Sequence, residues 1–242
     1  MNKIFAFAIG NIWRWGHKNN RAKLLNPIRK LDISGVEITL ANKKELYDFK
    51  LTSSQIKWLR SLDYVSIHAP FKLVRKAGNK EEVVKQLDYI QRLYRKINAR
   101  NVIIHSTDLP SPALLSRYKM KFSTENHPKI THLGVKKLMP ILRRYKNLGL
   151  CLDVAHAYDW SGFETSNLVN IFGNRIAQVH LSGNYRKKPH QSMRKVSHSF
   201  IKSIQPIKEL NVPIVIEEDI KIKSIKYVKD EIKHIKSLFP VQ

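Results

Sequence analysis

The chain has 242 residues, with 44 lysines and arginines against 19 aspartates and glutamates, so its formal charge is +25. A content of 43% hydrophobic and 9% aromatic residues can fill a sizeable core, which excludes a disordered polycation. The single cysteine, Cys151, excludes a disulfide framework and predicts a reducing, cytoplasmic compartment. Since no apolar run approaches the roughly 20 residues that span a bilayer, we expect no membrane partner.

Short apolar runs rich in Ile, Val and Phe alternate along the chain with segments of helical periodicity. We predict strands at residues 3–9, 35–39, 64–68, 101–105, 121–125, 149–153, 175–181 and 213–217. Helical stripes occupy residues 83–97, 133–148 and 222–238, and Pro140 is expected to kink the second. Apolar strands that alternate with helices are typical of a parallel sheet covered on both faces. The sequence therefore predicts an α/β fold, a single (β/α)8 TIM barrel that forms one domain over residues 1–242.

Acidic and imidazole side chains stand at the carboxyl ends of the predicted strands from the second to the eighth. They are Glu37, His68, His105, Glu125, Asp153, His180 and Glu217. The carboxyl ends of barrel strands meet at one mouth, where reactive groups gather. Converging carboxylates repel and raise each other's pKa unless a cation lies between them. The pattern therefore predicts a divalent-metal site.

Four of these side chains form the predicted set of metal ligands: Glu125, Asp153, His180 and Glu217. A set this rich in oxygen suits Mn²⁺, Mg²⁺ or Co²⁺ at least as well as Zn²⁺. His156, three residues after Asp153, would overhang the site and could support a ligand, contact substrate or bind a second metal. Cys151 is expected in the core, and His127 and His132 on the surface.

Several motifs then carry a family resemblance. They are His68-Ala69-Pro70, Glu125-Asn126, the run Gly-Leu-Cys-Leu-Asp-Val-Ala-His-Ala at 149–157, His180-Leu181-Ser182-Gly183-Asn184, and Ile216-Glu217. Together they resemble the xylose isomerase-like TIM-barrel superfamily. That superfamily includes sugar and sugar-phosphate isomerases/epimerases and the endonuclease IV-type AP endonucleases (AP endonuclease family 2).

Resemblance to the isomerase/epimerase branch gives the first hypothesis. It implies that Glu125 and Glu217 are both metal ligands and acid/base groups on opposite sides of a small phosphorylated sugar. It also implies substrate contacts, which we assign to His68, His156, Arg186 and Lys188. A metal that chelates a carbonyl and its neighbouring hydroxyl acidifies the C–H between them, and a carboxylate can remove that proton. The run from His180 departs from the ketose 3-epimerase pattern at Gly183, where that pattern has Glu.

Resemblance to the endonuclease IV branch gives the alternative, a metal-dependent phosphodiesterase that acts on abasic or damaged DNA. Three zinc ions in that branch use nine ligands. This chain matches eight, adding His68, His105, His156 and His190 to the four ligands above. Lys188 stands where the ninth, an Asp, is expected, and a cation there would oppose a third metal. The sequence leaves open whether His190 or His198 faces the metal.

The positive charge is compatible with solvated lysines on helix faces or with a nucleic-acid partner. Basic loops at residues 14–23, 72–80 and 185–195 should all lie near the barrel mouth. Trp13 and Trp15, beside Arg14, could stack on bases or close the end of the barrel. A third hypothesis is therefore a barrel without catalysis that binds nucleic acid.

Overall fold

The computed structural model describes residues 3–16, 20–131 and 134–240. Eight parallel strands close into a barrel in the order β1-β10-β7-β6-β5-β4-β3-β2, which confirms the predicted (β/α)8 fold. The strands are β1 (Phe5–Ala8), β2 (Gly35–Thr39), β3 (Tyr64–His68), β4 (Asn101–His105), β5 (Phe122–Glu125), β6 (Leu148–Asp153), β7 (Ile176–Leu181) and β10 (Ile214–Ile216).

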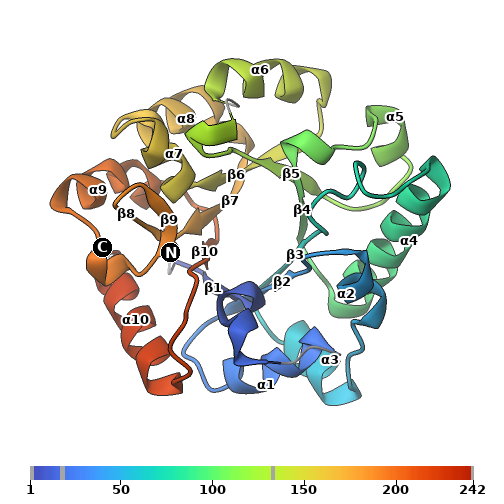
Figure 1. The fold of residues 1–242 in the computed structure, drawn as a ribbon, viewed down its shortest axis with the longest axis horizontal. Helices are drawn as coiled ribbons and strands as arrows, with labels where there is room; N and C mark the ends of the chain where they lie inside the picture. Colours follow the sequence, from blue (N-terminus) through green and yellow to red (C-terminus); the bar gives the residue numbers. More distant parts are fainter. Residues whose placement is uncertain (1–2, 17–19, 132–133, 241–242) are drawn as a thin grey trace.

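Helices surround this barrel on the outside (Figure 1). They are α1 (Leu25–Ile28), α2 (Lys43–Asp48), α3 (Ser53–Arg60), α4 (Lys80–Ile97), α5 (Pro112–Leu115), α6 (Val135–Arg144), α7 (Val154–Trp160), α8 (Glu164–Phe172), α9 (His198–Ser203) and α10 (Ile225–Ser237). Helix α4 begins where the Asn79 side chain accepts a hydrogen bond from the Glu82 backbone N–H, and it ends at Asn98, whose φ is 54°. Among the described residues, no helix is both long and apolar enough to cross a membrane.

Two strand predictions differ from the structure, and one pair of strands was not predicted, in ways that affect the site. The first strand stops at Ala8 because Ile9–Trp15 forms a 3-10 helix, η1. The last strand ends at Ile216, so Glu217 lies in the loop beyond it. A two-stranded hairpin of β8 (Gly183–Tyr185) and β9 (Lys188–Gln191) was not predicted, because its sequence contains no apolar run.

The hydrophobic core lies mainly between the strands and the helices, while the barrel interior is small and partly polar. Ala6, Ala8, Tyr64 and Val215 form a separate apolar cluster inside the barrel. Gly35 is required beside it, because an added Cβ would lie 2.7 Å from the Tyr64 carbonyl oxygen and 2.8 Å from the Ala6 Cβ. Interior space between the strands is thus too tight there for any larger side chain.

Above this cluster, a buried layer of polar side chains supports the mouth. The Gln178 side-chain oxygen accepts hydrogen bonds from the Tyr64 hydroxyl at 2.6 Å and the Asn101 amide at 3.1 Å. Ser123 donates in turn to the Asn101 side-chain oxygen at 3.0 Å. These bonds fix the Gln178 amide nitrogen toward the mouth, where Glu37 and His180 lie.

Candidate metal centre

Most of the acidic and imidazole side chains predicted at the strand ends do converge at the mouth. Their ligand atoms fall into a central group of four and two flanking groups of three, with all atoms of each group within 4.8 Å of one another. The central group is Glu125, Asp153, His180 and Glu217; the flanking groups are His68, His105 and Glu125, and Asp153, His156 and His190. Since Glu125 and Asp153 are each shared between the central group and a flanking group, the three groups form one continuous cluster.

The central group presents carboxylate oxygens to a single imidazole nitrogen. His180 Nδ1 lies 2.9 Å from Glu125 Oε1 and 2.9 Å from Glu217 Oε2. Asp153 Oδ2 is buried and has no hydrogen-bond partner among the described residues, since His156 Nδ1, 3.4 Å away, instead faces the Asn126 oxygen at 3.0 Å. A buried carboxylate oxygen without a donor is unfavourable, and a cation would satisfy it. The donors of this group therefore fit a divalent ion.

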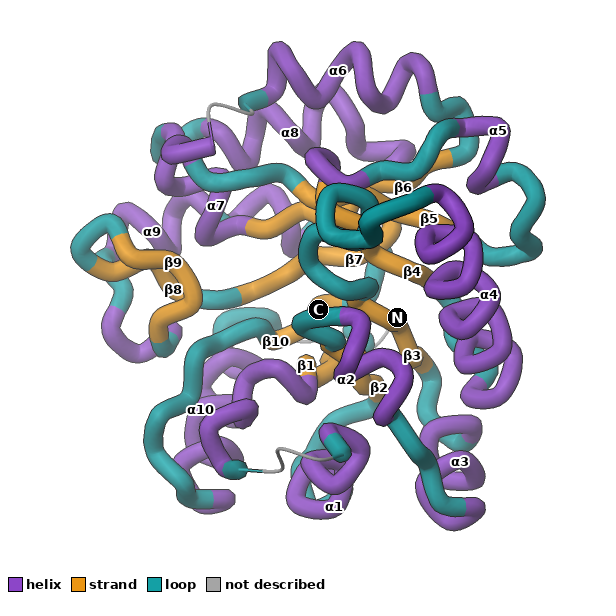
Figure 2. The backbone as a smooth tube through the Cα atoms, turned by 45° about the vertical axis from the view of Figure 1, so that its right-hand side comes forward, coloured by secondary structure: helices purple, strands orange, loops and turns teal. Residues whose placement is uncertain are grey.

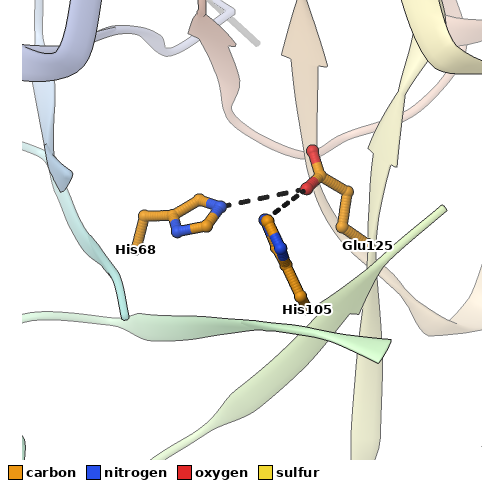
Figure 3. A group of neighbouring side chains, drawn as sticks. All are labelled: His68, His105 and Glu125. Atoms are coloured by element: carbon orange, nitrogen blue, oxygen red, sulfur yellow. Dashed lines mark ion pairs between the residues drawn. The ribbon is translucent and has the colours of Figure 1, made fainter. Parts of the chain in front are cut away.

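The first flanking group has the spacing of metal ligands rather than of hydrogen-bonded partners. His68 Nε2 and His105 Nε2 lie 3.8 Å and 3.6 Å from Glu125 Oε2, and both rings converge on that oxygen (Figure 3). These separations are too long for hydrogen bonds. Ligand atoms about 2.1 Å from a tetrahedral ion lie about 3.4 Å apart, close to what is observed.

Backbone carbonyls select the tautomer of three histidines in the flanking groups. Nδ1 lies 3.0 Å from the Ala69 oxygen in His68, 3.0 Å from the Asn126 oxygen in His156 and 3.0 Å from the Glu217 oxygen in His190. A carbonyl oxygen can only accept, so Nδ1 must carry the proton when the ring is neutral. That leaves Nε2 with a free lone pair, the form in which histidine binds a metal.

Electrostatics of the central group favour charged side chains despite burial. Burial would raise the pKa of Glu125, but the hydrogen bond from His180 and the nearby imidazole of His68 hold it well below its usual value. Burial would lower the pKa of His180, but its contacts with Cys151, Glu217 and Glu37 raise it well above its usual value. Without a metal, His180 is thus protonated between carboxylates, and an ion at Nδ1 would displace that proton.

His105 behaves differently, because burial and the positive charge of His68 lower its pKa to about 3. Its imidazole is neutral at physiological pH, with a lone pair available to a metal.

Glu37 lies one layer below the ligands, in the middle of β2, and has a supporting position that sequence reasoning did not assign. Its side chain is fully buried, and Oε2 accepts hydrogen bonds from Ser66 Oγ at 2.9 Å and Gln178 Nε2 at 2.9 Å. His180 Nε2 lies 3.1 Å from the same oxygen. The carboxylate therefore holds the Nε2 proton of His180 and turns Nδ1 toward the central group.

The loop after β5 contributes two residues whose role was also not predicted. Asn126 joins the ends of β5 and β6, because its side chain donates to the Asp153 oxygen at 2.8 Å and accepts from the Asp153 N–H at 2.8 Å. The expectation that His127 is a surface residue was wrong. Trp160 Nε1 donates to the His127 backbone oxygen at 2.8 Å. The buried His127 ring packs edge-on against the His105 ring, with 5.2 Å between centroids. His132 lies outside the described residues.

The structure answers the question of His190 or His198 that the sequence left open, and it also places Glu218 and Cys151. His190, and not His198, reaches the cluster, since His198 is exposed at the start of α9. Glu218 points away from the mouth, where its Oε1 accepts from the Met193 N–H at 3.0 Å, so Glu217 is the residue of that pair in the cluster. Cys151 is buried as expected, with its sulfur close to Glu125 and His180.

Cations and aromatic residues lie on the loops around the mouth. Arg186 and Lys188 are exposed residues of the β8–β9 hairpin, and the Arg186 guanidinium lies 5.1 Å from the centre of the Tyr185 ring. The sequence offered two interpretations of Trp13 and Trp15, which were stacking on bases or closing the end of the barrel. Trp15 is buried in the core, whereas Trp13 is half exposed and has the Arg14 guanidinium 4.2 Å from the centre of its ring.

Gly183 accounts for a departure from the ketose 3-epimerase pattern. An added Cβ there would lie 2.5 Å from Val196 Cγ1 and 2.8 Å from the Ser192 oxygen. No side chain fits at this position without moving backbone. The Glu expected there in a ketose 3-epimerase therefore has no place in this loop.

Comparison with solved structures places the barrel among known folds. Matches that cover nearly the whole of both chains include a D-tagatose 3-epimerase-like protein, with a TM-score of 0.70 and 18% identity over 98% of each chain. Endonuclease IV from Thermus thermophilus has a TM-score of 0.68 and 14% identity over 97% of this chain and 98% of that one. The fold is that of the xylose isomerase-like barrels.

A xylose isomerase domain protein from Salmonella typhimurium agrees with this, with a TM-score of 0.68 and 17% identity over 99% of each chain. No family model matches the sequence, and no curated protein is significantly similar to it. At these identities the xylose isomerase-like fold is shared, while the reaction has to be inferred from the site.

Proposed function

We propose that this protein is a divalent-metal-dependent phosphodiesterase of the endonuclease IV type that cleaves nucleic acid at abasic or damaged positions. The observation that carries the proposal is the sharing of Glu125 and Asp153 between the central group and the flanking groups of ligands. A carboxylate that serves two groups can bridge two ions, and paired ions are suited to phosphoryl transfer. A single-metal isomerase would need the central group alone.

The charge of the chain supports the same substrate class, and the fold is compatible with it. A formal charge of +25 favours an extended polyanionic partner over a small phosphorylated sugar. Endonuclease IV shares the fold over nearly the whole chain. The sequence by itself placed the isomerase/epimerase first, and the two flanking groups change that order.

Each side chain has a defined task in this reaction. Glu125 and Asp153 would each contribute to two neighbouring ion sites, and His68, His105, His156 and His190 would complete the flanking groups through imidazole nitrogens. Glu37 keeps the proton of His180 on Nε2, so that Nδ1 remains available. Bound divalent ions would polarise the scissile phosphodiester and activate water. Zn²⁺ suits the flanking groups, which contain two imidazoles each, better than Mg²⁺ does.

The isomerase/epimerase remains the second candidate function, because the central group of four includes both Glu125 and Glu217, the pair to which the family resemblance assigns acid/base chemistry. A small phosphorylated sugar would then be the substrate, with contacts from His68, His156, Arg186 and Lys188. Mn²⁺, Mg²⁺ or Co²⁺ would suit this oxygen-rich group.

Metal content and cleavage together test the proposal. The purified protein should hold two or three ions per chain, and metal-loaded protein should nick a duplex that contains one abasic site but not the undamaged duplex. His105→Ala removes a ligand of one flanking group only and should abolish nicking while leaving the central ion bound. One ion per chain, no nicking, and epimerisation of sugar phosphates that His105→Ala retains would instead establish the isomerase.

A further inference from the structure

A groove beside the candidate metal centre is lined by more basic than acidic side chains. Its volume is about 780 Å³, and its lining includes Lys129, Arg186, Lys187 and Lys195, with Asp159 as the acidic residue. Asp159 already accepts a hydrogen bond from the Lys129 backbone N–H at 2.9 Å. The aromatic rings of Tyr158 and Tyr185 also line the groove. Four cations and two aromatic rings therefore line one cavity.

The groove and the metal centre are built from the same two elements. Helix α7 begins directly after Asp153, contains His156, and provides Tyr158 and Asp159 to the groove. The β8–β9 hairpin lies against α7 at the edge of the barrel (Figure 2) and holds His190 near one end and two of the groove cations, Arg186 and Lys187, at its tip. Asn184 of the hairpin donates to the Ala155 oxygen of α7 at 3.0 Å, which ties the two walls together. A chain bound in the groove would thus lie next to the Asp153, His156 and His190 group.

The tip of the hairpin has an unfavourable backbone for the residues that occupy it. Tyr185 pairs with Lys188, and the two residues between them, Arg186 and Lys187, have φ values of 52° and 59°. A two-residue turn with both φ positive strongly favours Asn-Gly. Of the five described non-glycine residues with positive φ, three lie in this hairpin: Arg186, Lys187 and His190. Strained residues of this kind gather at functional sites.

We propose that the hairpin tip and this groove bind the sugar-phosphate backbone of a nucleic-acid strand as it enters the metal centre. Arg186 and Lys187 contact phosphates, and the exposed Tyr185 ring provides a stacking surface for a base or sugar. A repeating polyanion with planar groups matches cations interleaved with aromatic rings, whereas a single sugar phosphate would leave most of this groove empty. The choice of nucleic acid rests on the proposed function.

This inference predicts that stability and binding change in opposite directions. Replacing the tip by its preferred turn, Arg186→Asn with Lys187→Gly, relieves the strain and should raise the melting temperature by about 2 to 4 °C. The same change removes two phosphate contacts. It should weaken binding at least tenfold at 0.1 M salt and reduce the slope of log K against log salt by about 1.8. Arg186→Gln with Lys187→Gln removes the charges but not the strain, so it should lose binding without gaining stability.

The experiment uses metal-loaded protein and a fluorescein-labelled, undamaged duplex, with binding followed by anisotropy at several salt concentrations. Lys229→Gln with Lys233→Gln is the matched control, because it removes the same charge from a groove between α10 and residues 29–32, which precede β2 at the opposite end of the barrel. This control should bind within twofold of the unmodified protein, with the same salt slope.

A control that loses as much affinity as the hairpin variants would overturn the inference, since binding would then follow net charge alone. Hairpin variants that bind like the unmodified protein would overturn it too, as would a lower melting temperature for the Asn-Gly variant. The proposed function fails separately. Protein that binds through the hairpin but never nicks abasic duplex contradicts the phosphodiesterase and not the groove, whereas nicking without any contribution from the hairpin contradicts only the groove.

Discussion

Replacing Glu37 with Gln should weaken metal binding although Glu37 is not itself a ligand. The carboxylate is fully buried, and Ser66, Gln178 and His180 all converge on its Oε2. Gln occupies nearly the same volume and can still accept a hydrogen bond from His180 Nε2. What is lost is the negative charge that fixes the Nε2 proton and increases the basicity of Nδ1.

The expected size follows from the strength of that contact. A hydrogen bond to a charged acceptor contributes about 1.5 to 3 kcal/mol, against about 0.5 to 1.5 kcal/mol for a neutral one. The difference of about 1 to 1.5 kcal/mol corresponds to a metal dissociation constant about 5 to 12 times higher. That lies at the lower end of the roughly 10- to 100-fold loss typical when the partner of a metal-binding histidine is replaced.

Competition with a chromophoric chelator measures the dissociation constant directly, and circular dichroism of the metal-free protein checks that the fold is retained. Ser66→Ala is the matched control, because it removes one donor to the same oxygen but keeps the carboxylate. It should bind metal within twofold of the unmodified protein. Unchanged metal affinity in Glu37→Gln, or an equal loss in Ser66→Ala, would refute the assigned position of Glu37.

Three further predictions concern the cluster itself. Chelation should lower the melting temperature, because an ion that binds only the folded state adds to its stability, and identical melting with and without metal would exclude a metal site. Glu217→Gln should reduce turnover by at least about 10²- to 10⁴-fold in a steady-state assay while the fold stays intact. An active variant would contradict the assignment of Glu217 as a metal ligand and acid/base group. Burial lowers the pKa of His180, but its neighbours raise that pKa well above the usual value. The protonated imidazole therefore stabilises the metal-free fold at low pH, and this stabilisation is lost as the pH rises through the raised pKa. Metal must displace this proton, so the gain in melting temperature on adding metal should be smaller at pH 6 than at pH 8.5, and an equal gain would count against Nδ1 as a ligand.

Sequence alone predicted the barrel and the side chains of the central group, because both follow from local patterns. Apolar runs that alternate with helical stripes specify parallel strands covered by helices. A polar residue at the carboxyl end of such a strand must face the mouth once the barrel closes. Asp153 and His180 end adjacent strands and are paired in register, and this neighbourhood follows from the strand order. The order in turn follows from the right-handed connections of parallel strands.

Tertiary structure decided what depends on the paths of the loops and on the inner layers of the barrel. His190 reaches the cluster through a hairpin with three left-handed residues, which no periodicity predicts. His127 is buried because Trp160, from a later helix, holds its backbone. Glu37 supports His180 because barrel closure brings β2 and β7 to face each other across the interior, at a sequence separation of 143 residues. Such contacts arise from barrel closure and packing in three dimensions, so they cannot be predicted from the local sequence.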